Sequence, residues 1–90
     1  MRLDKYLKVS RILKRRTVSK ELAENGRVLV NGKIAKPATA IKVGDNVEVI
    51  FGQRHLLVEV LALENTVKKQ EADSLYQVIK EYTVGEENED

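Results

Sequence analysis

The fold of this chain is decided by one stretch, Gly26-Arg27-Val28-Leu29-Val30-Asn31-Gly32. Its centre, Val28–Val30, is rich in β-branched residues and predicts a strand. Asn31-Gly32 is the strongest short signal for a hairpin, because both residues tolerate the positive φ of a two-residue turn. Gly26 follows a helical pattern and is expected to end a helix. The stretch therefore predicts a helix before it and a hairpin within it.

Before this stretch, apolar residues recur at helical spacing. Leu3 and Leu7 lie one turn apart and predict a helix from Arg2 to Val9. Thr17 is a good N-cap for a second helix, Val18–Glu24.

After this stretch, short β-type runs alternate with turns containing glycine. The expected strands are Val28–Val30, Lys33–Ala35, Val47–Phe51 and His55–Leu61. A late helix is expected because four apolar residues fall at i, i+3, i+4 and i+7. These residues are Ala72, Leu75, Tyr76 and Ile79.

The predicted fold class is α+β: two N-terminal helices packed on a small, mostly antiparallel sheet, with a short C-terminal helix. We expect one domain over residues 1–65, a C-terminal helical segment over 66–84, and a disordered acidic tail over 85–90. Ninety residues give only a thin core, so the stability margin should be modest.

Composition excludes several classes of protein. No cysteine is present, which excludes disulfides, thiolate metal sites and a cysteine nucleophile. The one histidine, His55, follows a turn and is expected in an exposed loop or at a strand edge. No carboxylate pair stands in an apolar context that would tune it for catalysis. We therefore expect a cytoplasmic protein that is not an enzyme, has no metal or cofactor and does not contact a membrane.

Charge is divided unequally along the chain. Residues 1–54 carry 13 Lys and Arg against 5 Asp and Glu, a net +8, whereas residues 55–90 carry 3 against 9, a net −6. Such a division favours a polyanion-binding face near the N-terminus, although a basic run can also serve only solubility. The candidate phosphate-binding residues are Arg2, Lys5, Lys8, Arg11, Lys14, Arg15, Arg16 and Lys20.

Three residues next to this basic set, Thr17, Asp4 and Tyr6, could contribute to RNA binding. Arg15 and Arg16 precede the Thr17 cap, where helix N–H groups also attract phosphate. Asp4 could serve the helix dipole or could orient Arg2 or Arg16. Tyr6 is either a core aromatic or, less often, a platform for a stacked base.

The chain resembles the S4 RNA-binding domain family over about residues 1–51. The resemblance rests on four short motifs: Arg2-Leu3-Asp4, Arg16-Thr17, Gly26–Gly32 and Gly44-Asp45. In size and start, the chain is similar to its stand-alone, heat shock protein 15-like members, among them those of bacterial ribosome quality control. The resemblance implies an S4-type αL fold and RNA contact by the basic set. It also implies a monomer whose partners are the large ribosomal subunit, its rRNA, peptidyl-tRNA and the tailing factor RqcH.

Under this interpretation the protein binds large subunits that carry obstructed peptidyl-tRNA, contacts rRNA and tRNA, and supports alanine tailing of the stalled chain. Recognition would depend on phosphate geometry and shape more than on base sequence. Two alternatives remain open: an RNA-binding module of an rRNA or tRNA modification system, and a basic protein-interaction module.

Overall fold

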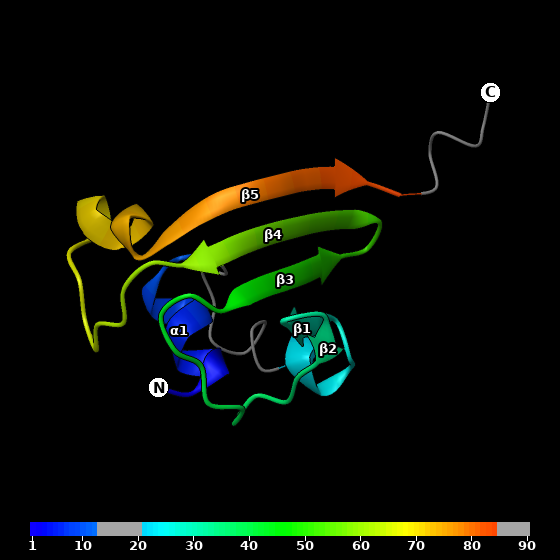
Figure 1. The fold of residues 1–90 in the computed structure, drawn as a ribbon, viewed down its shortest axis with the longest axis horizontal. Coiled ribbons are helices and arrows are strands. Elements are labelled where there is room, and N and C mark those ends of the chain that lie inside the picture. Colours follow the sequence, from blue (N-terminus) through cyan, green and yellow to red (C-terminus); the bar gives the residue numbers. More distant parts are fainter. Residues whose placement is uncertain (13–20, 85–90) are drawn as a thin grey trace.

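A computed structural model describes residues 1–12 and 21–84 of the chain. In this part of the chain, a helix near the N-terminus packs against a five-stranded antiparallel sheet with the strand order β2-β1-β3-β4-β5 (Figure 1). The elements are α1 (Leu3–Val9), β1 (Val28–Val30), β2 (Lys33–Ile34), β3 (Asn46–Phe51), β4 (Arg54–Val60), the 3₁₀ helix η1 (Lys69–Leu75) and β5 (Tyr76–Thr83). The predicted α+β class and antiparallel sheet are confirmed.

The hairpin between β1 and β2 forms as its sequence predicts. Val30 pairs with Lys33, so the loop holds only two residues. Both of these have positive φ, 53° at Asn31 and 84° at Gly32. This conformation is that of a type I′ turn, whose twist matches the twist of the paired strands.

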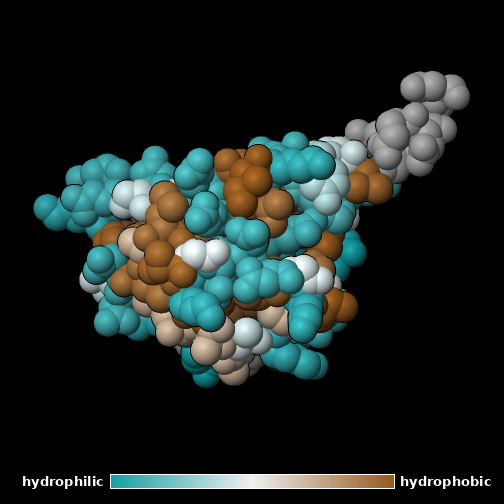
Figure 2. All heavy atoms as spheres, viewed as in Figure 1, coloured by the Kyte–Doolittle hydropathy of each residue, from teal (hydrophilic) through white to brown (hydrophobic). Residues whose placement is uncertain are grey.

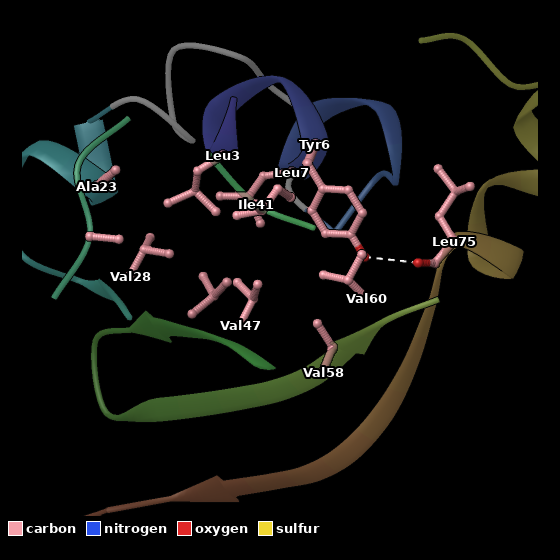
Figure 3. Close-up of a cluster of buried hydrophobic side chains, with 12 residues drawn as sticks. Leu3, Tyr6, Leu7, Ala23, Val28, Ile41, Val47, Val58, Val60 and Leu75 are labelled. Carbon is pink, nitrogen blue, oxygen red and sulfur yellow. Dashed lines mark hydrogen bonds between the residues drawn. The ribbon is translucent and has the colours of Figure 1, made fainter. Parts of the chain in front are cut away.

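The core lies between α1 and the sheet. Alternate residues of β3 and β4 point toward the helix. Leu3, Tyr6 and Leu7 of the helix pack against them, and none of the three has exposed surface. Figure 3 shows these three side chains directed at Val47 and Val58. Full burial of a leucine or valine side chain stabilises a domain by roughly 1.5–3 kcal/mol. Packing on the sheet therefore holds a helix of seven residues, which would be marginal in isolation.

The N-terminal end of α1 is fixed by the segment before β3. The backbone N–H groups of Leu3 and Asp4 donate to the carbonyls of Thr39 (2.9 Å) and Pro37 (3.1 Å). These carbonyls satisfy helix N–H groups that would otherwise lack partners. The orientation of α1 on the sheet is thereby set from outside the helix.

The prediction of a C-terminal helical segment over 66–84 is wrong. Residues 69–75 form one 3₁₀ helix, and Tyr76–Thr83 forms strand β5, which pairs with β4 along its length. The apolar spacing that suggested a helix is fortuitous, since Ile79 is 49% exposed and Tyr76 alone of the strand packs on the core. The edge of β4 offers a row of hydrogen-bonding groups, and pairing with it decides the conformation of this segment.

Other expected boundaries differ by one residue. Strand β2 ends at Ile34 and not at Ala35, and β4 spans Arg54–Val60 where His55–Leu61 was expected. Of the second predicted helix, residues 21–24 are described and are helical, and Gly26 follows them with φ of 74°. Residues 13–20 and the tail 85–90 lie outside the described residues. Within the described part of the chain, no helix is long and apolar enough to cross a membrane.

Candidate nucleic-acid interface

One face of α1 carries cations while the opposite face fills the core. Lys5 and Lys8 lie three residues apart and are both exposed, and Arg11 continues the same spacing just after the helix ends. Buried residues alternate with them, so packing of the helix directs these side chains outward. The structure therefore brings three of the predicted site residues together on one surface.

Arg11 has an unusual backbone conformation. Its φ is 62°, which non-glycine residues adopt infrequently, and its N–H donates to the Lys8 carbonyl (3.1 Å) at the end of α1. Glycine usually occupies such a position, because a Cβ is unfavourable there. An exposed arginine at this strained position suggests a role for its side chain beyond stability.

Arg2 is held by Asp4. The Arg2 Nε and Nη2 donate to the two carboxylate oxygens of Asp4, both at 3.2 Å. The carboxylate side chain is only 4% exposed, whereas 59% of the Arg2 side chain is exposed. Asp4 therefore contacts Arg2, one of the two arginines that it could orient, while the other, Arg16, lies outside the described residues. The forked contact fixes the guanidinium plane through Nε and Nη2, and Nη1 takes no part in it.

Tyr6 belongs to the core and not to the surface. It has no exposed area, and its hydroxyl donates to the Leu75 carbonyl at 2.9 Å (Figure 3). Burial, with a smaller contribution from nearby Tyr76, raises the pKa of Tyr6 above its ordinary value. Tyr6 cannot stack on a base without unfolding, so the core alternative is correct. Its bond also ties α1 to the junction of η1 and β5.

The remaining predicted contacts lie outside the described residues. They are Lys14, Arg15, Arg16 and Lys20, together with the Thr17 cap. Their contribution to the surface stays a prediction.

The two glycine-containing turns of the S4-like motif are joined by one polar network. The Asn31 side chain donates to Asp45 (3.1 Å) and accepts from the Asn46 N–H (2.9 Å), and Asp45 accepts from the Lys42 N–H (2.9 Å). The hydrogen bond from Lys42, followed by that from Asn31, holds the pKa of Asp45 below its ordinary value, although burial opposes this. Asn31 thus both forms the hairpin turn and fixes the hairpin to the loop before β3.

His55 lies on the face of the sheet that points away from α1. It is half-buried on β4, an inner strand, so the expected exposed loop or edge position is wrong. Its Nδ1 lies 2.6 Å from a Glu48 carboxylate oxygen. Its ring stacks on the ring of Tyr82, with the centroids 4.7 Å apart, and the Lys80 Nζ lies over the Tyr82 ring. These contacts join three strands. Among the described residues, no group of His, Asp and Glu could hold a metal ion.

Sequence reasoning did not identify Asn65 and Thr66. The Lys5 Nζ donates to the Asn65 Oδ1 (3.1 Å), which brings the loop after β4 beside the cationic face of α1. The same loop also borders a cavity of about 520 Å³, which is lined partly by the acidic residues Glu64, Glu71 and Asp73. A phosphate backbone is repelled there and attracted on the α1 side.

The sheet, the buried face of α1 and the motif network together define an S4-type RNA-binding domain. The profile of the S4 domain matches residues 1–47, and the chain belongs to this family.

Individual proteins that match nearly the whole chain give a narrower assignment than the family profile does. The chain is 57% identical to an RQC P-site tRNA stabilizing factor of Streptococcus pneumoniae, over 96% of this chain and 98% of the relative. It is 50% identical to the protein of the same name in Bacillus subtilis, over 96% and 100%. Among solved structures, the trimeric heat shock protein 15 of Vibrio cholerae is similar, with a TM-score of 0.79 and 28% identity over 87% of this chain and 80% of that one.

Proposed function

We propose that this chain is a non-enzymatic RNA-binding factor of ribosome quality control, which binds tRNA in the P site of large ribosomal subunits. The observation that carries the proposal is the exposed cationic face of α1 next to an arginine whose plane is fixed by Asp4, in a chain that is 57% identical to a factor of that name. Both features suit recognition of phosphates by position and charge.

The mechanism follows from a rigid scaffold. Buried Leu3, Tyr6 and Leu7 fix α1 on the sheet, so that its cations form one preorganised surface. This surface contacts the backbones of large-subunit rRNA and peptidyl-tRNA at once and holds the tRNA in place. A second factor, the tailing factor RqcH, then extends the stalled chain with alanine. The protein acts in the cytoplasm as a monomer.

Co-sedimentation with large subunits carrying tRNA tests this proposal. Arg2→Lys keeps a charge for Asp4 but loses the forked geometry, and Arg16→Ala removes the arginine of the S4 motif. We expect each to weaken association roughly tenfold or more, since a charge-assisted contact contributes about 1.5–3 kcal/mol. Lys80→Ala is the matched control, because Lys80 lies with Tyr82 and His55 on the opposite face.

Two outcomes would contradict the proposal. If the arginine variants sediment like the wild type while Lys80→Ala is lost, the interface lies elsewhere. If binding survives digestion of the RNA by nuclease, the basic face contacts a protein, which is the interaction-module alternative. Circular dichroism melts accompany each variant, because Asp4 is buried and a change at Arg2 also affects stability.

A further inference from the structure

A groove runs between α1 and the loop that follows β4. Two adjoining cavities of about 170 and 360 Å³ form it. Lys5, Lys8 and Arg11 line one wall, and Asn65 and Thr66 line the other. At roughly 30 Å³ for each water molecule, the groove has room for a phosphodiester group with several waters.

The two walls differ in chemistry but suit the same ligand. The helix wall supplies three cations, and none of the described residues that line the two cavities is acidic. The Asn65 Oδ1 already accepts from Lys5, so the Nδ2 of the same amide is the group left to donate into the groove. The Thr66 hydroxyl can also donate. A site with cations on one side and neutral donors on the other suits an anion rich in acceptor oxygens.

We infer that this groove binds one backbone phosphate of the RNA, with Lys8 and Arg11 supplying charge and Asn65 and Thr66 supplying hydrogen-bond donors. Lys5 is positioned for the same anion by its bond to Asn65. Within residues 1–12 and 21–84, no aromatic side chain lines the cavities, so the groove is suited to phosphate and not to stacked bases. The inference rests on the proposed function and adds residues beyond 1–47, the part that the S4 domain profile matches.

Asn65→Asp tests the groove most directly. The new carboxylate would pair with Lys5 and repel a phosphate. We expect affinity for purified tRNA and for large subunits to fall roughly tenfold, and the slope of log affinity against log salt to decrease by about one. The control is Gln53→Glu, which adds the same charge in the exposed β3–β4 turn, at the other end of β4. It should bind within about twofold of the wild type.

Two further variants keep the inference testable if Asn65→Asp folds poorly. Thr66→Val changes an exposed hydroxyl to a methyl of similar size and should weaken binding roughly two- to tenfold without changing the melt. Lys5→Ala combined with Asn65→Asp should cost less than the sum of the single changes, because the two residues act as one unit.

The outcomes separate this inference from the proposed function. If the two variants at 65 and 66 bind like Gln53→Glu while Lys8→Ala is weakened, the groove does not hold a phosphate, yet the helix face binds RNA. If wild-type protein shows no salt-dependent binding to tRNA or to large subunits, the proposed function itself fails. If Asn65→Asp weakens binding only to an acidic protein partner, and this binding survives nuclease treatment, the groove binds a peptide and the inference is wrong.

Discussion

Replacing Arg11 with glycine should move stability and RNA affinity in opposite directions. Arg11 has φ of 62°, and the left-handed conformation costs a non-glycine residue about 1–2 kcal/mol. Glycine removes this cost but gains about 0.5–1 kcal/mol of conformational freedom in the unfolded chain. The midpoints of these two ranges differ by a net stabilisation of roughly 0.8 kcal/mol. For a domain of this size the melting temperature should then rise by about 2–8 °C.

The affinity of the same variant should fall. Arg11 lines the groove beside Lys8, and on the inference above the variant would lose one charge-assisted phosphate contact. Such a contact contributes about 1.5–3 kcal/mol, which corresponds to roughly ten- to a hundredfold in the dissociation constant. Thermal melts by circular dichroism and fluorescence anisotropy with labelled tRNA at one fixed salt concentration measure the two effects. Arg11→Lys is the control, since it keeps both the charge and the backbone strain.

Two results would refute this reasoning, each in a different place. A lower melting temperature for Arg11→Gly would show that the backbone at this position is not strained. A higher melting temperature with unchanged affinity would show that the strain exists but that the Arg11 side chain does not contact RNA.

Three other perturbations have distinct expected outcomes. Gly32→Val should lower the free energy of unfolding by roughly 1–3 kcal/mol through backbone strain alone, since no atom of the described residues lies within 4 Å of an added Cβ; an unchanged denaturant midpoint would contradict this. The pKa of Glu48 lies below its ordinary value of 4.5, mainly because of its hydrogen bond to His55. The stability that this bond contributes should therefore be lost as the pH falls below about 4.5. In Glu48→Gln, melting temperatures measured between pH 3 and 7 should depend less on pH. Deleting residues 85–90, which carry four acids and no apolar side chain, should leave the melting temperature nearly unchanged, and a large drop would show that they support the fold.

The parts of the fold that were predictable depend on local signals. Asn31-Gly32 determines its own turn, because few other dipeptides tolerate two positive φ values. Leu3 and Leu7 determine the buried face of α1 by spacing alone. Strand β5 was not predictable in this way. Its conformation is set by pairing with β4. The helix-like spacing is fortuitous, since Ala72 and Leu75 lie in η1 and only Tyr76 and Ile79 lie in β5.

The candidate site divides along the same line. The cations of α1 follow one another at helical spacing, so the sequence indicates that they share a face. Asn65 stands sixty positions from Lys5 and has no motif around it. Only the course of the chain after β4 brings the two together. No local pattern could have identified this residue, because its contact is created by tertiary structure.

The loop after β4 also determines from which side a nucleic acid can approach. One side of the loop faces the cations of α1, and the other faces a cavity that Glu64, Glu71 and Asp73 help to line. A phosphate gains energy from the first and is repelled by the second, and the short distance between them makes the potential change sign across one loop. On the proposed function, an RNA backbone that follows α1 is therefore expected to leave this surface near Asn65. The difference in charge across the loop would then keep the bound strand on the helix face without a need for stacking on aromatic side chains.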